Sequence, residues 1–253
     1  MIVISRERIP EHRTAGVIVI GNEILSGKVR DENSPFLASE LRRLGVSLRR
    51  IDVVPDEIDL IAEATARHSR SYDFVFTSGG VGPTHDDRTI EGVATAFGQR
   101  VVRNALLVDL LKRYYGPRTT EVVLKMADVP EEAEIFYDDG IQLPVVTVRN
   151  VTVFPGVPDL LRQEFLSIQN RFATAPFISR RVYLRALESD IAPVLDKVEQ
   201  AFQQVDLGSY PVFDVDLPYK VMLTFDSKNA AAVDAAIARL LEQLPSDHIQ
   251  HVE

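Results

Sequence analysis

The sequence has no cysteine among its 253 residues. This absence excludes disulfides, thiolate metal ligands and thiol nucleophiles. It also has no apolar run close to the ~20 residues that a membrane-spanning helix needs. The short apolar start Met1–Ser5 is followed at once by Arg6, which does not fit a signal peptide. We therefore expect a cytoplasmic protein that has no membrane partner.

An excess of positive charge is lacking as well, because the formal net charge is −9. A general nucleic-acid binder needs a basic face, so we expect no nucleic-acid partner. The content of hydrophobic residues (45%) and of charged residues (26%) is ordinary for a globular protein. A chain of this length can form one large domain, or a large domain and a small one.

Up to about residue 172 the pattern is strand, loop and helix, repeated along the chain. Gly16–Ile20 and Asp73–Thr77 are continuous apolar runs, typical of strands buried on both faces, and a third strand is predicted at Leu48–Val54. Ser34 is the expected N-cap of the first long helix. The repeated alternation predicts an α/β fold over residues 14–175, with a three-layer, doubly wound and mostly parallel sheet.

Around Ala173–Phe177 the pattern changes. Residues 179–186 alternate between apolar and polar side chains, which is typical of a half-exposed strand. A helix at 190–202, two strands near 214–225 and a helix at 230–244 follow. We expect a second, smaller α+β domain at 176–253, with His248 and His251 as tail residues.

The strongest local motif is SGGVGPTHDD at residues 78–87, between a buried strand and a helix. Gly79, Gly80 and Gly82 allow a tight turn and bring amide N–H groups close to an anion, at the positive end of the next helix. In parallel sheets, ligands bind at the carboxyl ends of the strands. These three glycines, with Thr84, are therefore predicted to bind phosphate.

Two acids in the same loop, Asp86 and Asp87, would repel a phosphate unless a cation lay between them. A divalent metal held by Asp86 and Asp87 is therefore the natural third component. The alternative is structural, because an aspartate at the start of a helix is an ordinary N-cap. His85 is a candidate metal ligand or proton shuttle, or simply an exposed loop residue.

A second loop, residues 21–33, follows the first strand and supplies Glu23, Ser26 and Lys28. Strands one and three can be neighbours in a doubly wound sheet, so this loop and the glycine-rich loop are predicted to flank one crevice. Ser26 and Lys28 are candidate phosphate ligands. Asp56 follows the second strand at the same sheet edge, where capping the next helix is its simplest role and catalysis the sharper hypothesis.

Four motifs taken together resemble one family: GNEILSG (21–27), VPDE (54–57), SGGVGPTHDD (78–87) and FPGVPDLL (154–161). The set is similar to the molybdopterin-binding superfamily of MogA and MoaB, most of all to the N-terminal domains of CinA and of eukaryotic-type FAD synthases. The stretch 138–158 favours the FAD-synthase subgroup. LGSYP at 207–211 resembles part of the small domain that follows in such proteins.

The resemblance implies a metal-dependent nucleotide pyrophosphatase that hydrolyses a dinucleotide such as FAD or ADP-ribose to AMP and a second phosphate product. Asp56 and Asp87 match the family's two aspartates, so with Glu23 they are the candidate catalytic residues. The glycines match the loop that holds the phosphate of molybdopterin. The implied cofactor is a divalent metal: cobalt, manganese or magnesium.

Two other functions stay open at this point. One is binding or adenylylation of molybdopterin in molybdenum-cofactor biosynthesis, for which the same loops would serve. The other is a non-catalytic nucleotide-binding module. In each case the expected partner is a small nucleotide or pterin molecule, and the family habit of oligomerisation implies a homo-oligomer.

Overall fold

The computed structural model describes residues 12–137, 144–214 and 216–253. Its contacts divide the chain into two compact units that meet between Ala175 and Pro176, and each unit is described by itself. The predictions made for Met1–Ser5 and for part of the stretch 138–158 lie outside the described residues. Within the described ranges, no helix is long and apolar enough to cross a membrane.

A six-stranded sheet forms the centre of the first unit, with the strand order β2-β1-β3-β8-β7-β6. Strands β2, β1, β3 and β8 are parallel to one another, and β7 and β6 are antiparallel additions at one edge. The predicted mostly parallel α/β fold is confirmed. The strands are β1 (Arg13–Ile20), β2 (Val46–Val54), β3 (Phe74–Ser78), β6 (Glu134–Phe136), β7 (Val145–Val148) and β8 (Val151–Phe154).

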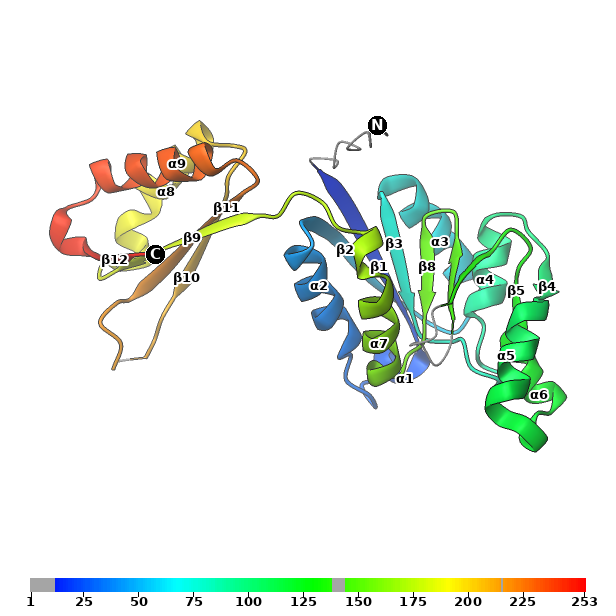
Figure 1. The fold of residues 1–253 in the computed structure, drawn as a ribbon. Coiled ribbons are helices and arrows are strands. Elements are labelled where there is room, and N and C mark those ends of the chain that lie inside the picture. Colours follow the sequence, from blue (N-terminus) through cyan, green and yellow to red (C-terminus); the bar gives the residue numbers. More distant parts are fainter. Residues whose placement is uncertain (1–11, 138–143, 215) are drawn as a thin grey trace, which may run out of the picture. The chain divides into compact units, whose positions relative to one another are not determined.

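Helices cover both faces of this sheet, which gives the three layers seen in Figure 1. On one face, Leu37 of α2 and Phe165 of α7 pack with Phe76 of the sheet. On the other face, Ile61 of α3 and Val93 of α4 belong to a second apolar cluster. The apolar stripes of the helices therefore match the two buried faces of the strands. These helices are α2 (Asn33–Arg43), α3 (Ile58–Ser71), α4 (Thr89–Ala96) and α7 (Pro158–Ile168).

The start of α2 differs from the prediction that Ser34 is its N-cap. The helix already includes Asn33, and the Asp31 carboxylate accepts hydrogen bonds from the amides of Asn33 (2.9 Å) and Ser34 (3.0 Å). Asp31 therefore satisfies the free amides of the first turn, and the prediction for Ser34 is wrong.

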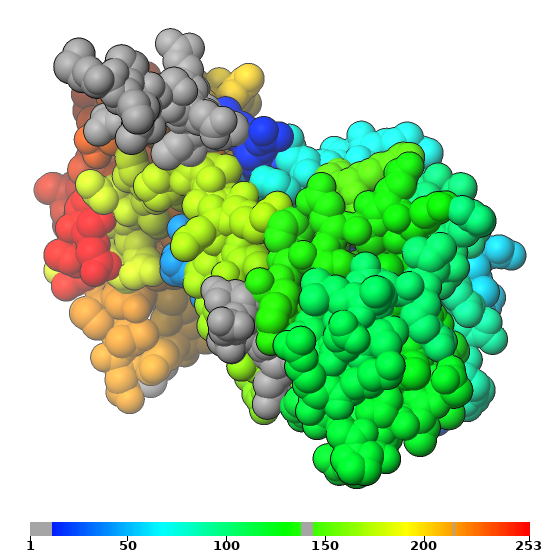
Figure 2. Space-filling model, turned by 45° about the vertical axis from the view of Figure 1, so that its right-hand side comes forward, coloured from blue at the N-terminus to red at the C-terminus, as the bar shows by residue number. Residues whose placement is uncertain are grey.

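A small substructure lies beside the sheet at its β6 side, between α4 and β6 in the chain. Two short strands, β4 and β5, pair antiparallel, and Leu107, Leu111, Ala127 and Val129 form a separate apolar cluster. In the space-filling view the residues of α5 and α6 (green) form one continuous surface (Figure 2). The elements are β4 (Val101–Arg103), α5 (Ala105–Tyr115), η1 (Gly116–Arg118), α6 (Glu121–Leu124), η2 (Lys125–Ala127) and β5 (Asp128–Pro130).

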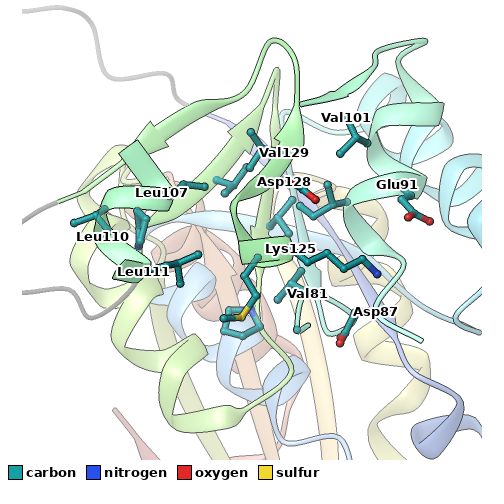
Figure 3. A pocket seen from close by; sticks show the side chains of 18 of the residues that line it. Val81, Asp87, Glu91, Val101, Leu107, Leu110, Leu111, Lys125, Asp128 and Val129 are labelled. Atoms are coloured by element: carbon teal, nitrogen blue, oxygen red, sulfur yellow. The ribbon is translucent and has the colours of Figure 1, made fainter. Parts of the chain in front are cut away.

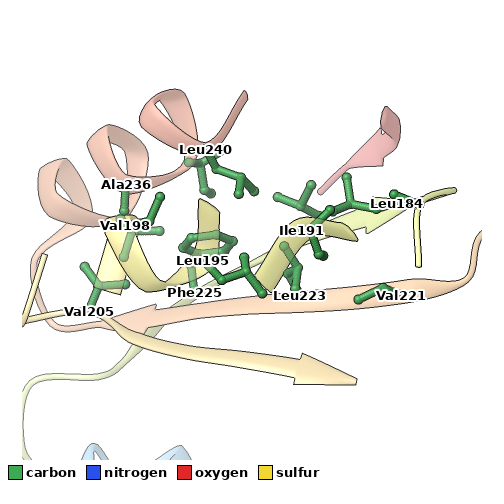
Figure 4. Close-up of a cluster of buried hydrophobic side chains, with 14 of the residues drawn as sticks. Leu184, Ile191, Leu195, Val198, Val205, Val221, Leu223, Phe225, Ala236 and Leu240 are labelled. Carbon is green, nitrogen blue, oxygen red and sulfur yellow. The ribbon is translucent and has the colours of Figure 1, made fainter. Parts of the chain in front are cut away.

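The second unit is an antiparallel four-stranded sheet of order β10-β11-β9-β12 with two helices packed on it. Leu184, Leu223 and Phe225 of the sheet meet Ile191, Leu195 and Leu240 of the helices in one core (Figure 4). The predicted smaller α+β domain is confirmed. Its elements are β9 (Ile178–Leu184), α8 (Glu188–Ala201), β10 (Asp206–Pro211), β11 (Val221–Ser227), α9 (Ala230–Gln243), η4 (Ser246–His248) and β12 (Ile249–Val252).

Two predictions for this unit are corrected. The strands expected near 214–225 are β10, which ends at Pro211, and β11, which runs to Ser227. The end of the chain is not a tail, because His251 lies in β12 opposite Tyr183 of β9, and the two rings stack with their centroids 5.9 Å apart.

Candidate functional site

The glycine-rich loop begins at the carboxyl end of β3, directly against the end of β1. Gly79 and Gly80 have φ angles of 106° and 64°, which L side chains rarely adopt. A Cβ atom on Gly79 would lie 2.2 Å from the carbonyl oxygen of Ile20, the last residue of β1. The amide of Gly79 donates to the carbonyl of Phe154 at 3.1 Å, so this N–H is already used within the fold.

Thr89, the first residue of α4, holds the loop against its helix. Its hydroxyl donates to the carbonyl of Gly79 at 2.7 Å, and its amide donates to the carbonyl of Gly80 at 3.0 Å. Within the described residues, the amides of Gly80 and Gly82 donate no hydrogen bond. Two N–H groups near the start of α4 are therefore available to an anion.

Asp87 holds the later part of the glycine-rich loop by hydrogen bonds to Thr84. Its Oδ2 atom accepts hydrogen bonds from the amide of Thr84, at 2.7 Å, and from the Thr84 hydroxyl. Helix α4 begins only at Thr89, and no side chain caps it. The alternative that Asp86 or Asp87 caps this helix is therefore wrong.

The other two polar residues of the loop face solvent. The side chains of His85 and Asp86 are 97% and 61% exposed, with His85 Nδ1 3.8 Å from Asp86 Oδ1. Across residues 12–137, 144–214 and 216–253, no group of three or more histidines and acids could hold a metal ion by itself. Any metal bound here would need ligands from its substrate or from water.

In the loop of residues 21–33, Glu23 lies near the end of β1, and Asp56 reaches this loop from the end of β2. The Asp56 carboxylate accepts a hydrogen bond from the amide of Asn22 at 2.8 Å. A Cβ atom on Gly21 would lie 2.6 Å from Glu23 Oε1, so the Glu23 side chain lies over the end of β1. Helix α3 begins at Ile58 without a side-chain cap, so the capping role considered for Asp56 is wrong. Asp56 instead joins its own loop to the short helix α1 (Asn22–Leu25).

The predicted phosphate ligands of this loop are exposed. The Ser26 hydroxyl donates to the carbonyl of Glu23 at 3.2 Å, which closes the turn after α1. Lys28 is exposed in the same turn.

Asn33 connects this loop to two strand ends, a role that the sequence motifs did not indicate. Its side-chain amide donates to Ser78 Oγ and to the carbonyl of Gly156, both at 2.8 Å. Ser78 ends β3 and Gly156 follows β8, so one buried side chain connects the regions after β1, β3 and β8. Its position immediately before Ser-Pro at a helix start was the available signal.

A cavity of about 140 Å³ opens between the glycine-rich loop and the substructure around α5. Figure 3 shows the leucines of α5 on one side and Asp87 and Glu91 on the other, with Lys125 pointing toward the acidic side. The lining residues are Gly80, Val81, Gly82, Asp87, Ile90, Glu91, Val101, Leu107, Leu110, Leu111, Lys125, Met126, Asp128, Val129, Pro144, Val146, Val153, Pro155 and Glu164.

The predicted site residues are thus divided between two places. Gly80, Gly82 and Asp87 line the cavity. The residues that do not line it are Glu23, Ser26, Lys28, Asp56, Gly79, Thr84 and Asp86. Thr84 donates to the Asp87 carboxylate, and Gly79 provides the turn that brings Gly80 to the cavity.

Glu164 is a cavity residue that sequence reasoning missed. It lies on α7 and is 6% exposed, and burial raises the pKa of its carboxyl group to about 8. Leu161 and Ile168, three positions before and four after it, are also buried, so helical spacing placed it on the inward face. An acid on an apolar stripe was the signal that could have identified it.

Comparisons with known proteins assign the chain to a family. Residues 16–173 match the model of the "Probable molybdopterin binding domain", and residues 176–253 match that of the "FAD synthase, middle domain". A protein from Archaeoglobus fulgidus is 34% identical over 228 residues, which cover 90% of this chain and 96% of that one. The chain belongs to the molybdopterin-binding domain family, as the motifs predicted.

Two further relatives are informative. The "Probable FAD synthase" of Caenorhabditis elegans is 31% identical over 278 residues, covering 97% of this chain and 52% of that one. The chain therefore spans about half the length of this relative. The crystal structure of CinA from Thermoplasma acidophilum, titled as of unknown function, is 32% identical; the match covers 64% of this chain and 99% of that one, with a TM-score of 0.59.

Proposed function

We propose that this protein is a metal-dependent nucleotide pyrophosphatase that hydrolyses a dinucleotide such as FAD or ADP-ribose to AMP and a second phosphate product. The observation that supports this most is the composition of the cavity. Unbonded amides of Gly80 and Gly82 and the carboxylate of Asp87 share it with an apolar wall to which α5 contributes three leucines. Such a cavity suits a ligand with one anionic part and one flat apolar part.

The need for a cation follows from the charges in the cavity. A diphosphate placed on the Gly80 and Gly82 amides would be repelled by the nearby Asp87 carboxylate unless a positive ion lay between them. Mg²⁺ and similar ions are commonly held by one or two carboxylates together with substrate phosphates. Asp87, with the exposed Asp86 beside it, fits this donor set even though the described residues contain no closed metal cluster. When bound, the ion would stabilise the charge that develops on the phosphates.

In the proposed hydrolysis, the oxygen of a water molecule bonds to one phosphorus while the bridging oxygen leaves with the other phosphate. The water proton is released to a base. The exposed Glu23 carboxylate is our candidate for this base, and Lys28 and Ser26 in the same loop would contact a phosphate. We assign Asp56 a positioning role, because its carboxylate holds the amide of Asn22, next to Glu23.

The test is a grid of substrates and metals. Purified full-length protein would be incubated with FAD, ADP-ribose or a diadenosine substrate and with cobalt, manganese, magnesium or a chelator, and AMP release would be measured. Asp87→Asn is expected to lose turnover, and the matched control Asp234→Asn, an exposed position on α9, is expected to keep it. Absence of AMP under every condition would refute the proposal.

Molybdopterin binding or adenylylation is the second candidate, supported by the family description that matches residues 16–173. Adenylylation of molybdopterin from ATP, without hydrolysis of any dinucleotide, would place this function first. Tight binding of a nucleotide without turnover under any metal would instead favour a non-catalytic module. Assembly into a homo-oligomer stays a prediction, which light scattering of the purified protein would check.

A further inference from the structure

Some of the charged side chains that line the cavity form hydrogen bonds or ion pairs with other residues, and others do not. Asp87 accepts from Thr84, Glu91 pairs with Arg88 at 3.0 Å, and Asp128 pairs with Arg103 at 2.8 Å. The other two charged lining residues come from η2 and from α7. Within the described residues, the side chains of Lys125 and Glu164 form no hydrogen bond or ion pair.

Of these two, Glu164 is the unusual one. A lysine can extend its ammonium group to water, but Glu164 is only 6% exposed. A buried carboxyl group without a hydrogen-bond partner costs free energy relative to an apolar residue of similar size. Its helical neighbours Leu161, Phe165 and Ile168 are all buried and apolar, so packing alone would favour a leucine here.

The rest of the wall suits a flat ring. Most of the lining side chains are apolar, including Leu107, Leu110, Met126 and Val129, and Glu164 is the buried polar group among them. Pockets of this kind hold a ring by apolar contact and orient it through a few polar groups.

We propose that Glu164 is a specificity-determining residue whose carboxyl group pairs with the edge of a nitrogen heterocycle bound in this cavity, at a position where an N–H donor lies beside an acceptor. This inference rests on the proposed function in that it takes the ligand to be a nucleotide. Both the N6 and N1 edge of adenine and the N3 and O4 edge of a flavin ring have this arrangement. The two rings are distinguished by the experiment below.

The protonation state of Glu164 fits this pairing. Because burial raises its pKa to about 8, the group is protonated at neutral pH and offers one O–H donor beside one carbonyl acceptor. An ionised carboxylate offers acceptors only. A glutamine presents the same donor and acceptor as the protonated acid at every pH, whereas a leucine presents neither. The charged groups that share the cavity are Asp87, Glu91, Lys125 and Asp128.

The experiment measures binding of AMP, FMN and ribose 5-phosphate by calorimetry, at about pH 6.5 and about pH 9, on either side of the raised pKa. The ratio of AMP or FMN affinity to ribose 5-phosphate affinity isolates the base from the phosphate. In the wild type we expect this ratio to be about tenfold or more at the lower pH, for two added hydrogen bonds, and to shrink at the higher pH. The compound with the larger ratio identifies the ring.

Two variants separate pairing from packing. Glu164→Gln is expected to keep the ratio at both pH values, and Glu164→Leu to lose it at both while remaining folded by thermal unfolding. Glu242→Gln, at a surface position on α9, serves as the matched control and should follow the wild type. A ratio that Glu164→Leu preserves, or that is independent of pH in the wild type, would overturn the inference.

The outcome is separable from that of the proposed function. If AMP is released from dinucleotides but the base preference ignores Glu164, only this inference fails. If Glu164 controls the preference but no metal supports hydrolysis, the cavity binds a nucleotide and the enzymatic proposal fails.

Discussion

Gly82 and Asp87 are matched to each other: a Cβ atom on Gly82 would lie 2.7 Å from Oδ2 of Asp87, closer than real Cβ contacts come. The same Oδ2 atom holds the amide of Thr84. The lack of a side chain at Gly82 therefore allows the Asp87 carboxylate to occupy its position at the cavity.

From this relationship we predict that Gly82→Ala moves the Asp87 carboxylate and lowers turnover of the dinucleotide by at least about tenfold, which corresponds to ~1.4 kcal/mol of barrier. Steady-state AMP release measures this. If the alanine acts through Asp87, adding Asp87→Asn to Gly82→Ala should cause no further loss, since coupled neighbours are not additive. Independent, additive losses would contradict the coupling.

Asp56 gives a second prediction, because its carboxylate accepts from the amide of Asn22. Asn at this position still offers an oxygen acceptor, so Asp56→Asn should keep most of the turnover. Asp56→Ala removes the acceptor, and turnover should fall severalfold as the loop of residues 21–33 loses this hydrogen bond. Equal and complete loss in both variants would show that the negative charge itself is needed, and that Asp56 acts in the reaction.

The third prediction concerns stability and pH. The pKa of Glu164 is raised from 4.5 to about 8 in the fold, so between these values the native state holds a proton that the unfolded state releases. The contribution of this group to the free energy of unfolding is full below about pH 4.5 and is lost as pH rises to about 8, by a few kilocalories per mole. Guanidinium unfolding at several pH values measures it.

A buried histidine supplies the internal control. His68 is fully buried with Nε2 2.9 Å from Asp52 Oδ2, and burial lowers its pKa below 6.5, so its effect has the opposite sign. Stability is therefore lost as pH falls from about 6.5 toward the lowered pKa of His68. Glu164→Gln should therefore reverse the slope, giving stability that rises as pH increases toward about 6.5. An unchanged slope in Glu164→Gln would contradict the raised pKa.

A fourth prediction compares two glycines with left-handed backbone. Gly45 has a φ of 78°, and a Cβ atom there would lie 2.1 Å from the carbonyl oxygen of Ala175. Gly98 has a φ of 64° with open space around it. Gly98→Ala should cost about 1 kcal/mol from backbone strain alone, and Gly45→Ala clearly more because of the clash. Chemical unfolding of the two variants checks this, and equal costs would argue against the close contact.

The sequence predicted most of the fold because its periodic segments are long. An apolar run such as Gly16–Ile20 predicts a strand buried on both faces, and an amphipathic pattern such as that of α3 predicts a helix with one buried face. Short elements were missed: two of the four residues of β12 are polar, and it forms a strand through its pairing with β9. The start of α2 was predicted wrongly because both Asp31 and Ser34 are residue types that can satisfy the first amides of a helix, and the sequence alone does not show that Asp31 does so.

The site was predicted in part for a similar reason. Gly80, whose backbone conformation favours glycine, and Asp87, an acid in the same motif, could be identified from the sequence alone. The far wall of the cavity could not, since Leu110, Lys125 and Glu164 come together only when α5, η2 and α7 pack around the sheet. No local sequence pattern predicts that these three residues line the same cavity.

The central claim is that Asp87 and the glycine amides form a phosphate site that works with a divalent cation. The most direct measurement is the affinity for ADP by calorimetry, with Mn²⁺ and with a chelator, in the wild type and in Asp87→Asn. We expect Mn²⁺ to tighten binding to the wild type by tenfold or more, about 1.4 kcal/mol, and to have little effect on the variant. Equal sensitivity to Mn²⁺ in the two proteins, or no effect in either, would contradict it.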